Sequence, residues 1–164
     1  MAIIRVDKAQ ATYAGNLVSF VVPDGVTMTN GLVFNLGALA ANEREVHTIA
    51  APAAGTLATA EVLINATPEV MYAPADIALE DFALTEGQVG RGFHMSVGDI
   101  FTVTDDLITG NPVVGEFVVA ANGVYTLAAA DADPGNTRFL GQIIEETTLG
   151  FNQDQAWAFR VIKA

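Results

Sequence analysis

The sequence predicts a mainly β protein, built as small barrel or sandwich-type lobes with Gly-rich turns and little helix. Short runs of β-branched and aromatic residues recur along the whole 164-residue chain, separated by turn residues that include 15 Gly and 6 Pro. No long stretch shows the periodicity of an amphipathic helix. At this length the chain can bury a substantial core, as one domain or two small ones.

An N-terminal β region is expected over residues 17–72. Its strand candidates are 17–22, 32–36, 44–49 and 57–64. The first ends at Pro23-Asp24-Gly25, where Pro presets φ and Gly tolerates the positive φ of a turn. In the last candidate small or apolar residues occupy every second position, which predicts a half-buried strand.

A connecting loop with at most a short helix is expected over residues 73–92. The strand pattern is interrupted by Pro68 and Pro74, and Leu79 and Phe82 then lie three residues apart.

A C-terminal β region is expected over residues 93–164, with strand candidates 93–95, 100–103, 113–120, 124–128, 139–144 and 157–162. Asn122-Gly123 suits the turn of a hairpin, because both residues tolerate positive φ. In the last candidate Trp157 and Phe159 share one face, since side chains two apart on a strand point the same way. The expected core anchors are Trp157, Phe159, Phe101 and Phe117.

The charge balance argues against nucleic acid and membranes as partners. The chain carries 19 acidic and 7 basic residues, for a formal net charge of −12. Such a chain would be repelled by a phosphate backbone and by an anionic membrane surface. Apolar residues nevertheless make up 51% of the sequence, which predicts an apolar surface reserved for an oligomeric or partner interface.

Neither a signal peptide nor a membrane helix is expected. Arg5, Asp7 and Lys8 place charges where a signal peptide needs an apolar stretch. The most apolar window, 49–66, is interrupted by Pro52, Gly55 and Glu61. We therefore expect the protein to be made and used in water.

No catalytic site is predicted, and the chain is not expected to be an enzyme. It has no Cys, and its two histidines, His47 and His94, lack a partner at catalytic spacing. Its adjacent carboxylates, Asp105-Asp106, Glu80-Asp81 and Glu145-Glu146, would point to opposite faces of a strand rather than to one substrate atom.

No metal or cofactor site is predicted either. Segment 131–136 starts like a calcium loop, but its Gly stands fifth instead of sixth, which favours an ordinary Asx-type turn. Segment 87–92 lacks the helix and the Lys of a phosphate-binding loop, so a flexible connection or tight turn is favoured. Segment 65–67 spells a glycosylation acceptor, to which we assign no function without a secretion signal.

Four of the seven basic residues lie near the chain ends: Arg5, Lys8, Arg160 and Lys163. Chance at exposed ends would explain this distribution. The sharper hypothesis is that both termini lie on the same edge of the fold and dock on an acidic surface, while the acidic bulk stays in solvent. Segment 9–15 offers little to pack, so residues 1–16 form a candidate arm that orders on binding.

Several segments resemble small structural proteins of tailed bacteriophages, which are encoded with the head genes and are often capsid decoration, or cement, proteins. The segments are Glu43-Arg44-Glu45-Val46, Pro68-Glu69-Val70-Met71-Tyr72, Leu79-Glu80-Asp81-Phe82, 92–103 and Gly141-Gln142-Ile143-Ile144-Glu145. The resemblance extends over most of the chain from about residue 31 onward, and none of its segments is a diagnostic motif.

The resemblance implies a β-rich virion protein, made in the host cytoplasm, that binds the outer surface of the capsid. Its partner would be the major capsid protein of a tailed phage, and it would commonly be a homotrimer, with no nucleic acid, membrane or cofactor involved. It would stabilise the shell mechanically, by bridging capsomers, with several weak contacts acting together. The four terminal basic residues and the arm 1–16 are the candidate capsid-binding elements.

Two alternatives stay open. The same β scaffold could be a head fibre or a host- or carbohydrate-binding module of the virion that exposes Tyr13, Tyr72 and Phe93. A hydrolase using dispersed carboxylates is the least favoured, because it would need a carboxylate of strongly raised pKa in a deep cleft.

Overall fold

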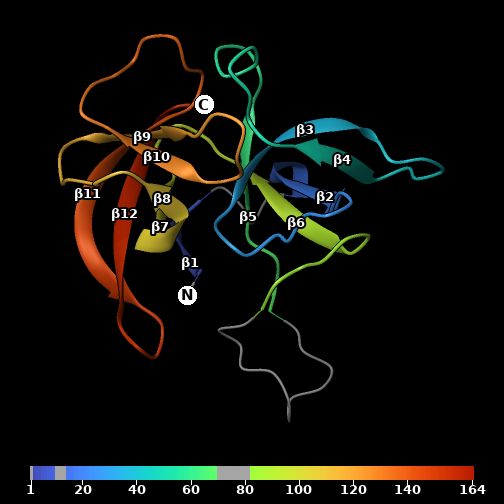
Figure 1. The fold of residues 1–164 in the computed structure, drawn as a ribbon, viewed down its shortest axis with the longest axis horizontal. Helices are drawn as coiled ribbons and strands as arrows, with labels where there is room; N and C mark the ends of the chain where they lie inside the picture. Colours follow the sequence, from blue (N-terminus) through green and yellow to red (C-terminus); the bar gives the residue numbers. More distant parts are fainter. Residues whose placement is uncertain (1, 10–13, 70–81) are drawn as a thin grey trace.

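The computed structural model describes residues 2–9, 14–69 and 82–164 and confirms a mainly β fold (Figure 1). The strands form one large open sheet and one closed barrel, which lie side by side. Helical structure in the described residues is limited to the short 3-10 turns Ala14–Asn16 and Asp105–Leu107.

The barrel is built from β2 to β6. These strands are β2 (Leu17–Val21), β3 (Val33–Leu39), β4 (Val46–Ala50), β5 (Val62–Asn65) and β6 (Val89–His94). Their order is β2-β4-β3-β5-β6, and β6 pairs back onto β2 to close the barrel. All of these pairs are antiparallel except β2 with β4.

The large sheet contains the remaining strands: β1 (Ile4–Lys8), β7 (Ile100–Thr104), β8 (Ile108–Thr109), β9 (Phe117–Ala120), β10 (Leu127–Ala130), β11 (Leu140–Leu149) and β12 (Asp154–Lys163). Their order is β1-β7-β12-β11-β9-β10-β8. The first strand of the chain therefore lies at one edge of the sheet, separated from the last strand only by β7.

Strands β3 and β5 form a wall shared by two hydrophobic cores. They pair with Phe34 opposite Leu63 and Val33 opposite Ile64. Phe34 and Leu63 point into the barrel core, where Phe34 packs on Phe20 with ring centroids 4.7 Å apart. Val33 and Ile64 point the other way, into the core between the barrel and the large sheet. Alternation along each strand thus supplies both cores at once.

Two glycines of β6 make room for the barrel's aromatic rings. A Cβ on Gly90 would lie 2.4 Å from Phe20 Cζ, and a Cβ on Gly92 would lie 2.5 Å from Phe34 Cζ. Segment 87–92 is therefore not only a connection or tight turn, as expected, because residues 89–92 belong to a barrel strand. Glycine is required there by the close approach of the rings.

Three of the expected core anchors are buried in the core between the two sheets: Phe101, Trp157 and Phe159. The Trp157 indole also donates its Nε1 hydrogen to Asp105 Oδ1 at 2.7 Å. The expectation for Phe117 is wrong, because this residue is only half-buried and its neighbour Val118 holds the core position. The predicted strand 113–120 is a strand only from Phe117 onward, and its inward face was misassigned.

The expected region boundaries also need correction. Residues 4–8 are not part of a separate arm, because they pair with β7 as an integral strand. The boundary between 92 and 93 falls inside β6, which pairs with β2 and β5 of the barrel. The short helix considered within 73–92 falls largely outside the described residues.

The strand expected over 57–64 begins only at Val62. The preceding residues form consecutive turns, in which the Thr56 and Leu57 amides both donate to Ala53 O, at 2.8 and 3.0 Å. The Ala/Thr-rich sequence satisfies its own backbone locally instead of extending the sheet.

Leu63→Ala should lower the free energy of unfolding by about 2–5 kcal/mol, because it leaves a cavity in the barrel core. Strands β3 and β5 cannot move to fill this cavity, since their other face is packed in the second core. Urea denaturation followed by Trp157 fluorescence would measure this. The control is Val97→Ala, at a position 67% exposed, which should cost less than about 0.5 kcal/mol. Equal effects of the two substitutions would contradict the shared wall.

Candidate functional site

The two terminal strands gather basic residues on one face of the large sheet. Lys8 and Arg160 both lie opposite Ile100 of β7, one on each side. In the same way Arg5 lies opposite Thr102. Directly opposed residues share a face, and the alternate residues of β7 point into the core, so these cations point away from it. We call this outward surface of β1, β7 and β12 the terminal face; its residues are Arg5, Asp7, Lys8, Ile100, Thr102, Ala158 and Arg160.

Arg5 is engaged within the terminal face. Its Nε lies 2.5 Å from Asp7 Oδ1, and its Nη2 donates to Thr102 Oγ1 at 3.4 Å. The buried Thr102 hydroxyl donates in turn to Asp7 Oδ2. Arg5 and Asp7 together close over Thr102, so part of the Arg5 charge is offset inside the chain.

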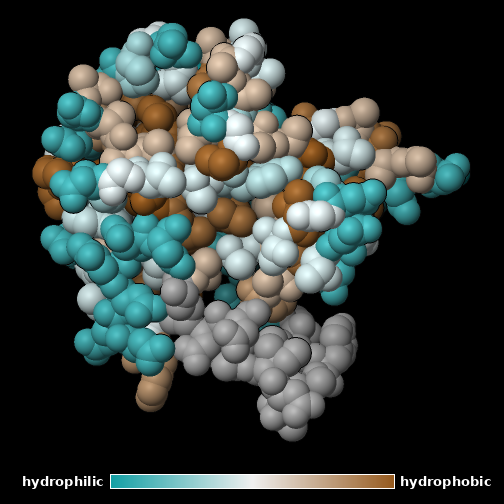
Figure 2. Space-filling model, viewed as in Figure 1, coloured by the Kyte–Doolittle hydropathy of each residue, from teal (hydrophilic) through white to brown (hydrophobic). Residues whose placement is uncertain are grey.

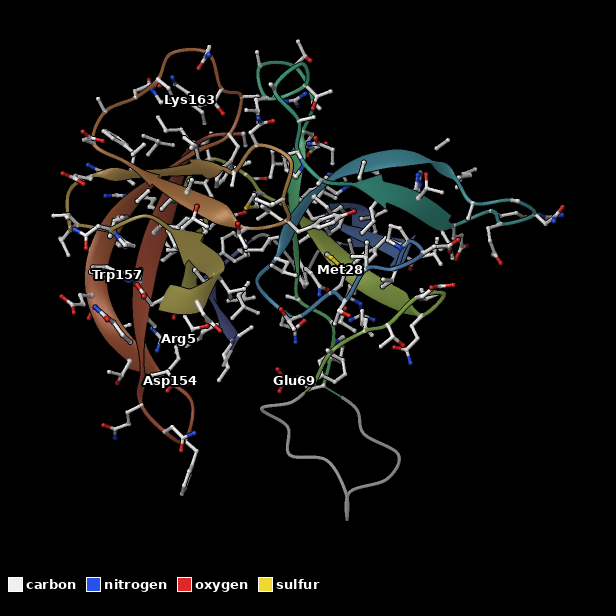
Figure 3. The ribbon with its side chains drawn as sticks, viewed as in Figure 1. Arg5, Met28, Glu69, Asp154, Trp157 and Lys163 are labelled. Carbon is white, nitrogen blue, oxygen red and sulfur yellow. The ribbon has the colours of Figure 1, made fainter. Side chains whose placement is uncertain are left out.

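Lys163 lies away from the other cations. Figure 3 shows it at the opposite end of the large sheet from Arg5. Its ammonium group pairs with Asp133, in the loop between β10 and β11. This hydrogen bond from Lys163, together with one from the Gly135 N–H, holds the pKa of the Asp133 carboxyl below its usual value. Segment 131–136 is thus an Asx-type turn held by Lys163.

Lys8 and Arg160 are therefore the cations best placed to bind something outside the chain. Among the described residues neither makes an ion pair, and both are exposed. Their strands are separated by β7, which puts the two main chains about 10 Å apart. The four predicted residues split into a central pair, Lys8 and Arg160, and two cations with acidic partners of their own.

Two grooves are lined by described residues. The first, of about 340 Å³, lies between β1 and the barrel and is lined by Ile4, Val6, Asn30, Ala66, Thr67, Pro68, Glu69, Arg91 and Phe93. The second, of about 470 Å³, is largely apolar and lies beside the loop before β11, where Leu57, Val119, Val124 and Pro134 contribute to it. The only hydroxyl of the first lining, on Thr67, donates to Asn65 Oδ1 and accepts from the Arg91 N–H, so it serves the fold.

The polar residues beside the first groove serve the fold. Asn65 is fully buried; its Nδ2 donates to Thr29 O at 2.8 Å, and its Oδ1 accepts from Thr67 Oγ1 at 2.7 Å. Asn30 bonds both backbone groups of Thr67, at 2.8 and 2.9 Å. Asn65 is thus enclosed by its own chain, which agrees with giving segment 65–67 no role as a glycosylation acceptor.

The remaining candidates for chemistry are dispersed. His94 Nδ1 lies 2.8 Å from Glu61 Oε1, and His47 Nδ1 lies 3.1 Å from Gly37 O, in different parts of the barrel. No cluster of three or more His, Cys, Asp or Glu residues that could hold a metal ion occurs in the described part of the chain. Of the aromatic residues considered for carbohydrate binding, Phe93 packs partly against the core, and Tyr13 and Tyr72 lie outside the described residues.

One exposed aromatic residue was missed by the sequence reasoning. Phe151, in the turn between β11 and β12, is 97% exposed. Figure 1 shows this hairpin extending beyond the rest of the large sheet. The sequence signal was present, because Phe151 stands between Gly150 and Asn152, which are turn residues rather than strand residues.

The apolar excess of the sequence does not gather into one patch on the face shown in Figure 2, where hydrophobic residues appear as separate spots among hydrophilic ones. The exposed large hydrophobic residues are Val6, Leu39, Val89, Val97, Val113, Val114, Val124 and Phe151, and they come from many different elements.

Comparison of this chain with protein-family models, with curated proteins and with solved structures found no match. In the described residues, no helix has the length and apolar character needed to span a membrane.

Lys163→Met should raise the pKa of the Asp133 carboxyl toward its usual value, because the substitution removes the charged hydrogen-bond donor. A pH titration of the Asp133 carboxyl carbon by NMR would measure the shift. Lys8→Met, which removes the same charge from another strand, should leave this pKa unchanged. If Lys163→Met also left it unchanged, the pairing would be contradicted.

Proposed function

We propose that this protein is a non-enzymatic structural protein of a phage virion that binds the outer surface of the capsid through its terminal face and stabilises the shell by bridging capsomers. The proposal rests on the resemblance of the sequence to tailed-phage head decoration proteins. It is supported by the β-rich fold and by the terminal face. It is also supported by the wide separation of the histidines and other reactive side chains among the described residues.

The observation that carries the proposal is the Lys8 and Arg160 pair. On a chain of net charge −12, these two cations lie on the same sheet face, on either side of Ile100. An acidic shell surface would attract this face and repel the rest of the molecule, so the charge pattern would orient the subunit as it docks. Ile100 would supply an apolar contact between the two charges.

Stabilisation would be mechanical. A terminal face placed across the junction of two capsomers would hold them together through contacts that are individually weak. In a homotrimer, which the resemblance implies, three such faces would act together and raise the overall affinity far above that of one. The major capsid protein is the proposed partner and the outer surface of the virion the proposed location.

Lys8→Glu combined with Arg160→Glu should weaken binding to capsids lacking this protein by at least about tenfold, because two attractive contacts become repulsive and the loss is multiplied across linked copies. Co-sedimentation of the purified chain with such capsids would measure the affinity. Circular dichroism would verify that the variant is folded.

The matched control is Arg44→Glu combined with Arg91→Glu, which makes the same change in net charge on the barrel side of the molecule. This control should bind nearly as well as the wild type. A similar loss in both variants would show that only net charge matters, and undiminished binding by the Lys8/Arg160 variant would contradict the proposed face.

A second function is favoured by Phe151. An aromatic side chain fully exposed at the tip of a projecting hairpin is suited to stacking on a sugar ring or entering a partner's pocket, as a head fibre or host-binding module requires.

On this alternative, Phe151→Ala should abolish binding of the purified protein to host cells or to a panel of immobilised glycans, without changing capsid attachment. Because the side chain packs against nothing, the fold should be unaffected. Binding to cells that is equal for Phe151→Ala and wild type would remove this second function.

A further inference from the structure

The first strand of the chain leaves one backbone edge open. β1 lies at the end of the large sheet and pairs only with β7 among the described strands. The Thr104 N–H donates to Ile3 O at 3.1 Å, so Ile3 belongs to a hydrogen-bonded pair with Thr104. Such pairs alternate along an antiparallel ladder, so Arg5 also directs its main-chain groups toward β7. The N–H and C=O groups of Ile4 and Val6 consequently point in the plane of the sheet toward its open edge.

The residues along this edge are largely exposed, and Ile4 and Val6 also line the first groove. All residues of β1 after Ile4 are exposed, and Val6 is a large apolar residue with 39% of its surface in solvent. An exposed strand edge of this kind is a template for another strand, and proteins usually protect it with charges or bulges. β1 has both, since a bulge lies between Val6 and Lys8 and three of its five residues are charged.

The charges of β1 are self-complementary in one register. If two copies of β1 pair antiparallel about Val6, Arg5 of each copy lies opposite Asp7 of the other, and Val6 lies opposite Val6. Arg5 and Asp7 lie on the same sheet face, as their shared partner Thr102 shows. The same register brings the outward main-chain groups of Val6 into a hydrogen-bonded pair with Val6 of the other copy, and the bulge before Lys8 ends the ladder on either side.

The registers centred on the two neighbouring residues are worse. A pairing centred on Arg5 would set two guanidinium groups against each other, and one centred on Asp7 would set two carboxylates against each other. Neither centre directs its main-chain groups to the open edge. The charges of β1 thus favour self-pairing about Val6 over self-pairing about Arg5 or Asp7.

We propose that two copies of this protein associate by antiparallel pairing of their β1 strands about Val6, joining their large sheets across a two-fold axis. The occupant of the edge is a second copy, because Arg5, Asp7 and Val6 match their own sequence in reverse. β1 carries Arg5 and Lys8 against Asp7, so it adds no net negative charge to a contact between two acidic chains.

This inference is independent of the proposed function. The dimer contact uses Arg5 and Asp7, at the rim of the terminal face, whereas the proposed capsid contact uses Lys8 and Arg160. A two-fold contact is also distinct from the contact that would close a trimer. It would link two chains in solution or on neighbouring sites of a shell.

The test is a charge exchange read by sedimentation-velocity ultracentrifugation of the full chain at low salt. Arg5→Asp and Asp7→Arg each place like charges opposite each other at both symmetric positions, so each should weaken the dimer by about tenfold or more. An equimolar mixture of the two variants restores opposite charges at both positions. The mixture should therefore form a heterodimer with affinity near that of the wild type.

Two controls make the outcome decisive. Arg44→Asp, far from β1 in the loop before β4, should leave dimerisation unchanged. Val6→Pro should abolish dimerisation while circular dichroism stays unchanged, because the lost N–H faces the open edge and not β7. A wild-type chain that is monomeric up to about millimolar concentration, where such contacts become measurable, would overturn the proposal. Failure of the mixture to associate, or a larger oligomer insensitive to all these variants, would also overturn it.

Discussion

The structure depends on the burial of both faces of the β3–β5 pair. Phe34 and Leu63 fill the barrel, and Val33 and Ile64 fill the space between the barrel and the large sheet. Because side chains alternate along a strand, a slip of one residue in this pair would exchange the contents of the two cores. The register of two short strands therefore fixes both halves of the molecule, and neither half has a core that is independent of this wall.

The organisation of the terminal face follows from this wall. The inner face of the large sheet packs on it through Phe101, Phe159 and their neighbours. On the opposite face of β1, β7 and β12, small side chains such as Thr102 and Ala158 are buried, whereas Lys8 and Arg160 are exposed. Charged residues can occupy that face at little cost to stability. The order β1-β7-β12 then brings cations from the two ends of the sequence onto one surface. Attachment to a shell and self-pairing at the open edge would both use the part of the molecule that the core leaves free.

Strand alternation and turn chemistry were enough to predict the mainly β fold and the burial of Trp157, because these depend on neighbours in sequence. Phe117 was assigned to the wrong face, because alternation along a strand separates two sets of residues without showing which set faces the core. In the structure Val118 faces the core. The pairing of β1 with β7 joins residues separated by well over half of the chain and has no local signal. For the same reason the terminal cations were recognised, but the Asp133 partner of Lys163 was not, since only the folded chain brings them together.

The most direct test of the shared wall is native-state amide hydrogen exchange of the wild-type chain at increasing denaturant, resolved by NMR. If both cores depend on the β3–β5 pair, the protected amides of β5 in the barrel and of β12 in the large sheet should exchange through the same opening, with equal free energies that converge on global unfolding. An opening of lower free energy that exposes β5 while β12 stays protected would contradict the account, because the large sheet would then hold its core without the wall.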